Sequence, residues 1–400
     1  MSVKGRVTFA LKQTHVLYCF ILVLLLEPAY VSNISSLAIV WEVLKLMCCS
    51  GCVFLYFIDL IKNKNGTKIE YFILLYSGYL YVISALHHNY YNTDILALFV
   101  QLALMMITAY GIKRDAEGYI GVLNKVLLFY CIINFFTVLA FPNGIYVIGN
   151  YYDLDVRYWF LGNRNPLSRQ MLFTVSIDLI ESFLYKDKMK AKNIGIIIIC
   201  LATVIIVGSV TAFIGMTFLL AVTFINKKKG YSKLINIFFV YIGAFIVSDL
   251  LIVQQVQYKF INLLSFFGRD VTLSGRNYVW SKSLAAIRDN LLWGYGYEYK
   301  STVLQRIGAS HTHNFYLWTL LCGGIVGLAL FSIIIFTVSK HVMDKMIYRY
   351  NRIGFALISS FFVMGISESL TLMPLFLAII FLVDFLSIND IREIHPGVRD

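Results

Sequence analysis

The residues best suited to chemistry stand at the end of a polar stretch, residues 254–313, that separates two apolar blocks. His311 and His313 are one residue apart there, and Asn314 follows directly. Because the unperturbed pKa of histidine is about 6.5, an imidazole can accept the proton of an attacking hydroxyl near neutral pH. We therefore predict that His313 is a catalytic base and that His311 and Asn314 contact the substrate. A structural pair of histidines at a membrane interface is the alternative.

The two histidines could instead bind a metal ion. No Cys, Asp or Glu lies close by in the sequence to complete such a site, and Glu298 is the nearest acid. Protein metal sites usually combine several such ligands. The sequence therefore predicts no metal and no other cofactor.

Arginine is the main basic residue of two long polar stretches, residues 142–166 and 254–313, and their margins. These segments contain three lysines and seven arginines: Lys259, Lys282, Lys300, Arg157, Arg164, Arg169, Arg269, Arg276, Arg288 and Arg306. A guanidinium offers a fixed fork of donors that matches phosphate, whereas an ammonium is a hydrated point charge. We therefore expect an anionic, phosphorylated ligand here. The alternative is that arginine replaces lysine in these stretches by chance.

Arg276 stands at the start of a predicted short amphipathic helix. Ser274 can cap this helix by accepting an N–H from its first turn. An apolar stripe at helical spacing follows, made of Trp280, Leu284, Ile287 and Leu291. We expect the helix to lie on the membrane surface and to hold Arg276 at its N-terminus, which itself favours anions.

Glycines follow this helix at two places. Gly294-Tyr295-Gly296 permits a tight turn after the helix ends near Asn290. Gly323, Gly324 and Gly327 lie inside the next apolar block, where small residues allow backbones to approach closely.

The composition predicts an all-α polytopic membrane protein. Apolar residues form 59% of the 400-residue chain and charged residues only 14%, and the mean hydropathy is +0.74. The apolar residues fall into blocks long enough to cross the roughly 30 Å hydrocarbon layer. We therefore expect one integral membrane domain over residues 1–400, with about twelve transmembrane helices. Their predicted ranges are 15–32, 37–61, 69–87, 93–112, 119–141, 167–185, 193–209, 210–226, 233–253, 314–338, 353–369 and 370–388.

The positions of the lysines predict the orientation of this domain. Loops rich in Lys and Arg fall on one side of the predicted spans, which is cytoplasmic by the positive-inside rule. Residues 142–166 and 254–313 are then external loops. The cytoplasmic lysines supply most of the net charge of +12, and no nucleic-acid-binding motif is present. All seven cysteines lie in apolar blocks, which argues against disulfides in the exposed loops.

Three motifs in this order resemble the O-antigen polymerase and ligase family. They are Ser-Gly-Arg-x3-Trp at 274–280, Asn-x3-Gly-x-Gly at 290–296, and His-Thr-His-Asn at 311–314. The ligase-type signature His-Asn-x9-Gly-x2-Gly is met by His313, Asn314, Gly324 and Gly327. At the level of motifs the resemblance covers about residues 270–330.

This resemblance implies an enzyme that transfers glycan from a polyprenyl-diphosphate-linked donor without a metal or a nucleotide sugar. Family members use an arginine of an earlier outer loop, in an Arg-x3-Leu pattern, and a second arginine of the large loop. Arg157 with Leu161 fits the first position, Arg164 is a rival for it, and Arg276 fits the second. The Arg-x10-Gly pattern of some polymerases is absent, because Ile287 occupies the glycine position.

The expected function is a membrane glycan polymerase that joins undecaprenyl-diphosphate-linked oligosaccharides into O-antigen, capsular or exopolysaccharide. It would act with inversion at the external face of the bacterial cytoplasmic (inner) membrane. Its expected partners are this donor, membrane lipids, and a flippase and a chain-length regulator of the same pathway, but no nucleic acid. One alternative is a ligase that transfers glycan to lipid A core. Another is a transporter or flippase for lipid-linked glycan, which should carry charged residues near the membrane midplane.

Overall fold

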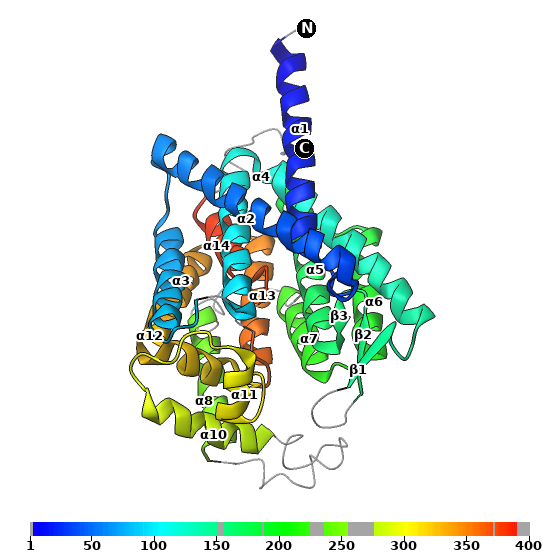
Figure 1. Cartoon of the computed structure of the whole chain (residues 1–400). Helices are drawn as coiled ribbons and strands as arrows, with labels where there is room; N and C mark the ends of the chain where they lie inside the picture. Colours follow the sequence, from blue (N-terminus) through cyan, green and yellow to red (C-terminus); the bar gives the residue numbers. More distant parts are fainter. Residues whose placement is uncertain are drawn as a thin grey trace.

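The computed structural model describes residues 3–90, 92–149, 155–185, 188–224, 236–254, 276–370 and 373–389, which are mainly helical (Figure 1). The predicted helical class is therefore confirmed for the larger part of the chain. The N-terminal elements are α1 (Val3–Leu25), the 3-10 helix η1 (Val31–Asn33), α2 (Ser35–Asn63), α3 (Lys68–Leu86) and α4 (Thr93–Ala140). Next come α5 (Arg164–Tyr185), α6 (Ala191–Ile206), α7 (Val210–Phe224) and α8 (Ile237–Ile252). The last helices are α10 (Arg276–Asp289), α11 (Lys300–Ile307), α12 (Phe315–Asp344), α13 (Arg349–Gly365) and α14 (Phe376–Ile388).

The apolar helices follow the layout of the predicted spans. Among the described residues, four helices (α2, α3, α4 and α12) are long and apolar enough to cross a membrane, and several shorter apolar helices accompany them. Helix α4 combines two predicted spans, 93–112 and 119–141, across a kink at Asp115. The Asp115 carboxylate accepts a bond from the Gly118 N–H at 2.9 Å, in the manner of a helix cap. The number of twelve spans stays a prediction.

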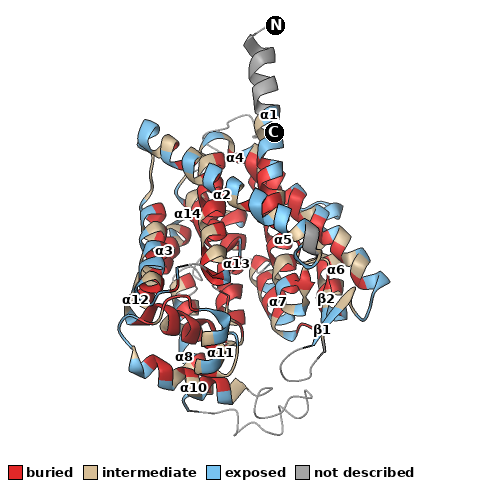
Figure 2. Ribbon diagram, viewed as in Figure 1, coloured by how far each residue is buried: buried red, intermediate tan, exposed pale blue. Residues whose placement is uncertain are grey.

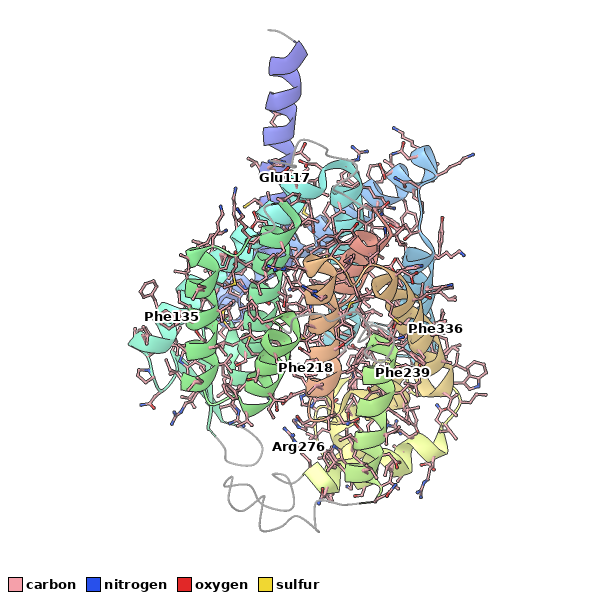
Figure 3. The ribbon with its side chains drawn as sticks, turned by 180° about the vertical axis from the view of Figure 1, so that it is seen from behind. Glu117, Phe135, Phe218, Phe239, Arg276 and Phe336 are labelled. Atoms are coloured by element: carbon pink, nitrogen blue, oxygen red, sulfur yellow. The ribbon has the colours of Figure 1, made fainter. Side chains whose placement is uncertain are left out.

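The exposed surface of the helices is apolar, as a lipid-facing surface should be. Figure 2 shows buried residues along α13 and α14 and exposed ones along α2 and α6. Phe239 of α8 is 58% exposed and Phe336 of α12 is 57% exposed, and both lie on the outside of the bundle in Figure 3. Contiguous apolar surface of this kind is rare on soluble monomers. The chain is therefore a membrane protein.

The loop over residues 142–166 contains strands that the sequence did not predict. Strands β1 (Tyr146–Gly149), β2 (Asp155–Trp159) and β3 (Gly162–Asn163) form an antiparallel sheet in the order β1-β2-β3. The expected all-α class is therefore incomplete. These strands are too short to give a clear alternation of apolar and polar residues, so the pattern carries little signal.

The described parts of both predicted external loops lie at the same end of the molecule. In Figure 1 helices α10 and α11 lie at the lower end, the sheet β1–β3 lies in the lower half on the right, and the connection from α2 to α3 lies at the upper left. Helix α11 was not expected from the sequence, because its eight residues are too few for a periodic pattern. The loops that are far apart in the sequence can thus form one surface.

Helix α10 confirms the predicted short helix but not its predicted position. Trp280 and Ile287 of its apolar stripe are buried, Leu284 packs against the core, and only Leu291, beyond the helix end, is largely exposed. The stripe therefore packs into the protein, against α11 and α12, and not onto lipid. The proposed cap Ser274 lies outside the described residues.

Helix α12 is broken at Gly324, and the segment after α10 fills the break. Gly324 has φ 59° and ψ −162°, which interrupts the helix. The N–H groups of Tyr295 and Gly296 donate to the carbonyls of Leu321 and Cys322 at 2.9 and 2.8 Å. The N–H groups of residues 325 and 326 donate to the carbonyls of residues 291 and 292. Inside a membrane such partners are needed, because freed backbone groups find no water.

We expect Gly324→Ala to destabilise the protein by about 2–4 kcal/mol. Alanine is strained at this φ, and its Cβ would lie 2.3 Å from the Leu292 carbonyl oxygen. Thermal unfolding of the detergent-purified protein measures the effect. Gly78→Ala is the control, because a Cβ at Gly78 of α3 meets nothing within 4 Å. Equal unfolding midpoints for Gly324→Ala and the wild type would contradict this account of the break.

Candidate functional site

Two arginines from distant segments converge on one buried carboxylate. Arg276 is the first residue of α10, Arg169 lies in the second turn of α5, and Glu368 follows α13. The guanidinium nitrogens of Arg169 and Arg276 lie 3.8 and 3.7 Å from the Glu368 carboxylate. The Asn165 side-chain amide donates to the same carboxylate at 2.8 Å. Figure 3 shows Arg276 at the lower end of the molecule, below α13.

Among the described residues, this cluster contains two guanidinium groups and one carboxylate. Two guanidinium groups face the single carboxylate of Glu368, whose residue is only 4% exposed. The Nε of Arg169 is buried and has no hydrogen-bond partner within the part of the chain that is described. Buried charges and donors normally find partners, so an arrangement of this kind can accept a further anion.

The segment His311–Asn314 is held beside this cluster by four helices. The indole N–H of Trp280 in α10 donates to the Thr312 carbonyl at 3.0 Å. The Asn314 side-chain oxygen caps α12 by accepting the Leu317 N–H at 2.9 Å. The amide nitrogen of Asn314 donates to Ser248 of α8 and to the carbonyl of Ile366 at the end of α13, at 3.0 Å each. Since Asn314 is fully buried and its amide is used within the protein, its position is fixed.

The two histidine rings lie against each other. Their centroids are 4.1 Å apart, and the ring planes meet at 80°. His313 has φ 52°, a left-handed conformation that is uncommon outside glycine and that often marks functional sites. The Nδ1 atoms of both rings are buried and have no hydrogen-bond partner within the described ranges. The rings therefore present nitrogen atoms that a ligand could use.

Burial keeps both histidines neutral. It lowers the pKa of His311 to about 4, with further lowering by the charges of Arg169, Arg276 and Lys300. Burial, followed by His311 and Arg276, lowers the pKa of His313 to about 2. In the free protein, neither histidine therefore has the near-neutral pKa that suits a catalytic base. The physical reason is desolvation of the imidazolium together with nearby guanidinium groups.

The structure brings together some of the predicted site residues and not others. Arg276 and His313 share one electrostatic environment with His311. Arg157 in β2 and Arg164 at the start of α5 are exposed, and neither forms an ion pair with the described residues. The arginine that meets Arg276 at Glu368 is Arg169.

The sequence contains a signal for Arg169 beside the family motifs. Asn165 and Arg169 are four residues apart in α5, and such residues lie on the same face of a helix. Both contact Glu368. Their partner follows α13, almost two hundred residues later, and no local pattern could predict that contact.

Within the described residues, no group of three or more His, Cys, Asp or Glu side chains is placed to hold a metal ion.

Comparison with known proteins supports the resemblance of the motifs. A family model described as O-antigen ligase matches residues 195–332, about a third of the chain. The matched segment contains Arg276, His311, His313 and Asn314, and it is similar to the O-antigen ligase family. No curated protein and no solved structure shows a significant match to the chain. The protein is thus a membrane protein with a segment that is similar to a glycan-processing family.

The lowered pKa values predict how stability depends on pH. Because the pKa of His311 in the folded protein is about 4, below the roughly 6.5 of an unfolded chain, protons bind the unfolded chain first as the pH falls. This stabilisation is fully present above pH ~6.5 and is lost as the pH falls towards the folded pKa. When the pH is lowered from 7 to 5, the thermal unfolding midpoint of the wild type should decrease. We expect a smaller decrease in the double variant His311→Gln/His313→Gln. His87→Gln, at an exposed histidine, is the control. An equal fall in the double variant and the wild type would contradict the burial of these rings.

Proposed function

We propose that this protein is a membrane glycan polymerase that uses undecaprenyl-diphosphate-linked oligosaccharides at the external face of the bacterial cytoplasmic membrane. The convergence of Arg169 and Arg276 on Glu368, beside two neutral histidines, carries this proposal. A pair of guanidinium groups suits a diphosphate, and a neutral imidazole suits an acceptor hydroxyl. The family match at residues 195–332 supports the choice of glycan as the transferred group.

In this proposal the two arginines bind the diphosphate of the donor. Glu368 holds the guanidinium groups in the free protein, and the incoming diphosphate replaces its carboxylate as their partner. As the sugar C1–O bond breaks, negative charge develops on the departing diphosphate, and the arginines stabilise it. The sequence pattern assigned the first arginine position to Arg157 or Arg164. The contacts at Glu368 favour Arg169.

His313 is the proposed base. The acceptor hydroxyl attacks the sugar C1, its proton passes to His313, and the polyprenyl diphosphate leaves from the opposite side, which gives inversion. Arg276 contributes to the low pKa of His313 in the free protein. A diphosphate bound at Arg276 would offset that charge, so binding of the donor would strengthen the base. His311 contacts substrate in this scheme, and Asn314 fixes the position of the segment.

A ligase that transfers glycan to lipid A core is the second candidate function. The description of the matching family model as O-antigen ligase favours it. Both reactions use the same donor and need the same arginines and base, so the acceptor separates them. For either function, the proposed partners include a flippase and a chain-length regulator of the same pathway.

Incubation of the purified protein with an undecaprenyl-diphosphate-linked oligosaccharide tests this proposal. We expect a ladder of products that differ by one oligosaccharide unit. Transfer to added lipid A core without a ladder would replace the polymerase by the ligase. Neither product would contradict both and would favour a transporter of lipid-linked glycan.

The arginine variants test the diphosphate site in the same assay. We expect Arg276→Ala and Arg169→Ala each to lower turnover by about 10²–10³-fold, because each removes a group that stabilises the departing diphosphate. Arg276→Lys should also be strongly impaired, because an ammonium cannot replace a planar fork. Arg157→Ala and Arg164→Ala are the comparison, and we expect mild effects. A severe defect in either of these, with an active Arg169→Ala, would return the role to the outer-loop arginine that the sequence pattern indicated.

The histidine variants separate the base from its neighbour. We expect His313→Ala to lose about 10²–10⁴-fold in turnover, which is typical for removal of a general base, and still to bind donor through the arginines. His311→Ala should retain measurable activity. The measurements are turnover and donor binding for both variants. Normal turnover in His313→Ala with an inactive His311→Ala would assign the base to His311.

A further inference from the structure

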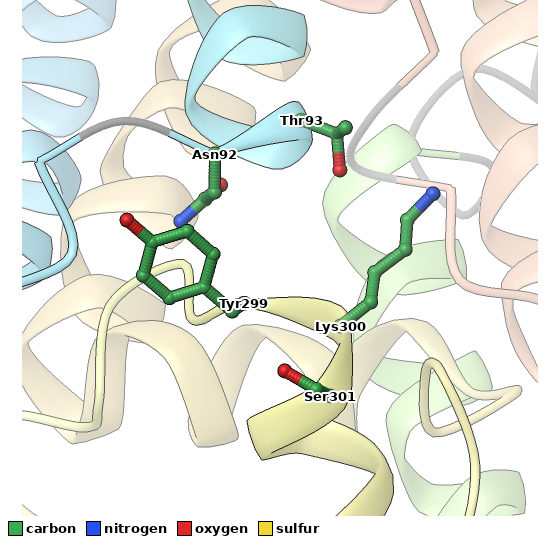
Figure 4. Close-up of a pocket in the computed structure, with 5 residues that line it drawn as sticks. All are labelled: Asn92, Thr93, Tyr299, Lys300 and Ser301. Carbon is green, nitrogen blue, oxygen red and sulfur yellow. The ribbon is translucent and has the colours of Figure 1, made fainter.

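A shallow depression of about 440 Å³ lies between the start of α4 and the start of α11. Its lining residues are Asn92, Thr93, Tyr299, Lys300 and Ser301. Figure 4 shows their side chains around one common space, with Asn92 and Thr93 from one chain segment and the other three from the opposite segment. None of these residues takes part in the reaction scheme above.

The two walls of the depression are fixed to each other. The Asn92 side-chain oxygen caps α4 by accepting the N–H groups of Asp94 and Ile95 at 3.0 and 2.9 Å. Its amide donates across the depression's base to the Tyr297 carbonyl at 2.7 Å. The Tyr297 N–H donates to the hydroxyl of Ser84 in α3 at 2.8 Å. The depression is therefore a preformed feature, which lowers the entropy cost of binding.

The lining has the chemistry of a sugar site. The Tyr299 side chain is 45% exposed and offers a ring on which the C–H face of a pyranose can lie. Thr93 and Ser301 offer hydroxyl groups that can donate and accept hydrogen bonds. Sites for small polar ligands commonly combine apolar contact with a few polar groups of this kind.

Lys300 adds an exposed positive charge to the lining of the depression. It is exposed, and it forms no ion pair with any described carboxylate. Glu298, two residues earlier, is instead held by Arg306, with contacts of 2.8 and 2.9 Å. Asp94 of α4 is buried and accepts a hydrogen bond from the Thr93 hydroxyl at 3.4 Å, and it interacts with Lys300 electrostatically without forming an ion pair. An ammonium in this position favours a ligand that carries a carboxylate.

The depression adjoins the proposed reaction site. Helix α11 begins at Lys300 and ends at Ile307, and Gly308 connects it to the histidine segment within a few residues. Lys300 is close enough that its charge contributes to the lowered pKa of His311. A glycan seated here could therefore extend towards the histidines.

We infer that this depression binds the acceptor glycan, and that Lys300 selects an acceptor whose sugar carries a carboxylate. The inference rests on the proposed glycan transfer and names the acceptor class at that site. Tyr299 holds the ring of the sugar, and Lys300 pairs with its carboxylate.

Sugar binding to the purified full-length protein, measured by saturation-transfer NMR, tests the inference without turnover. The probes are a glucuronic-acid-containing disaccharide and its carboxyl-reduced neutral counterpart. We expect the wild type to bind the acidic probe about three- to fivefold more tightly, as an exposed ion pair would give. Lys300→Met should abolish this preference and leave binding of the neutral probe unchanged. Tyr299→Ala should weaken binding of both probes, and Tyr299→Phe should not.

Lys282→Met is the matched control, because Lys282 lies over the Tyr278 ring of α10, away from the depression's lining, and its loss removes the same charge. The preference should persist in that variant. Equal binding of the two probes by the wild type, absence of binding, or a preference that survives Lys300→Met would overturn the inference. Failure of the proposed function would give a different result. The wild type would then not turn over the undecaprenyl-diphosphate-linked oligosaccharide, while the Lys300-dependent preference would remain.

Discussion

The candidate site depends on the interaction of the buried Glu368 carboxylate with its partners. Removal of a carboxylate from water has a large desolvation cost, which is offset only by close partners. Asn165, Arg169 and Arg276 supply those partners from α5 and α10. The carboxylate therefore links α10 to α5 and to the segment after α13. The buried Nε of Arg169 has no hydrogen-bond partner among the described residues, so the site can still bind an anion there.

The break in α12 places the other half of the site. A continuous helix would have no free backbone groups near Gly324, and residues 291–296 could not dock there. The docked segment joins α10 to α11, so it sets where Arg276 and Lys300 lie relative to the histidines. Asn314 fixes the first turn of the same helix. An irregular backbone inside a membrane protein is tolerated where the protein itself supplies the hydrogen-bond partners, and here it does so next to the reactive groups.

The sequence predicted the features that repeat along the chain or that depend on single residue types. Apolar blocks gave the helices, and the period of Trp280 and Ile287 gave α10. Gly294 and Gly296 were predicted to form a tight turn, and both adopt positive φ. Gly324 was predicted to allow close backbone contact, and it lies against the Leu292 carbonyl. The sheet β1–β3 was missed because its strands are short. The pairing of Arg169 with Glu368 and the low pKa values of the histidines were missed because both arise from tertiary burial, which no local pattern contains.

A cryo-EM structure of the protein with bound undecaprenyl diphosphate tests the central claim most directly. We expect the two phosphates to lie within hydrogen-bond distance of the guanidinium groups of Arg169 and Arg276, with the Glu368 carboxylate displaced from them. The imidazole of His313 should face the open side of the site, where an acceptor hydroxyl would approach. Phosphates bound at Arg157 or Arg164, with the contacts of Arg169 and Arg276 to Glu368 unchanged, would contradict the central claim.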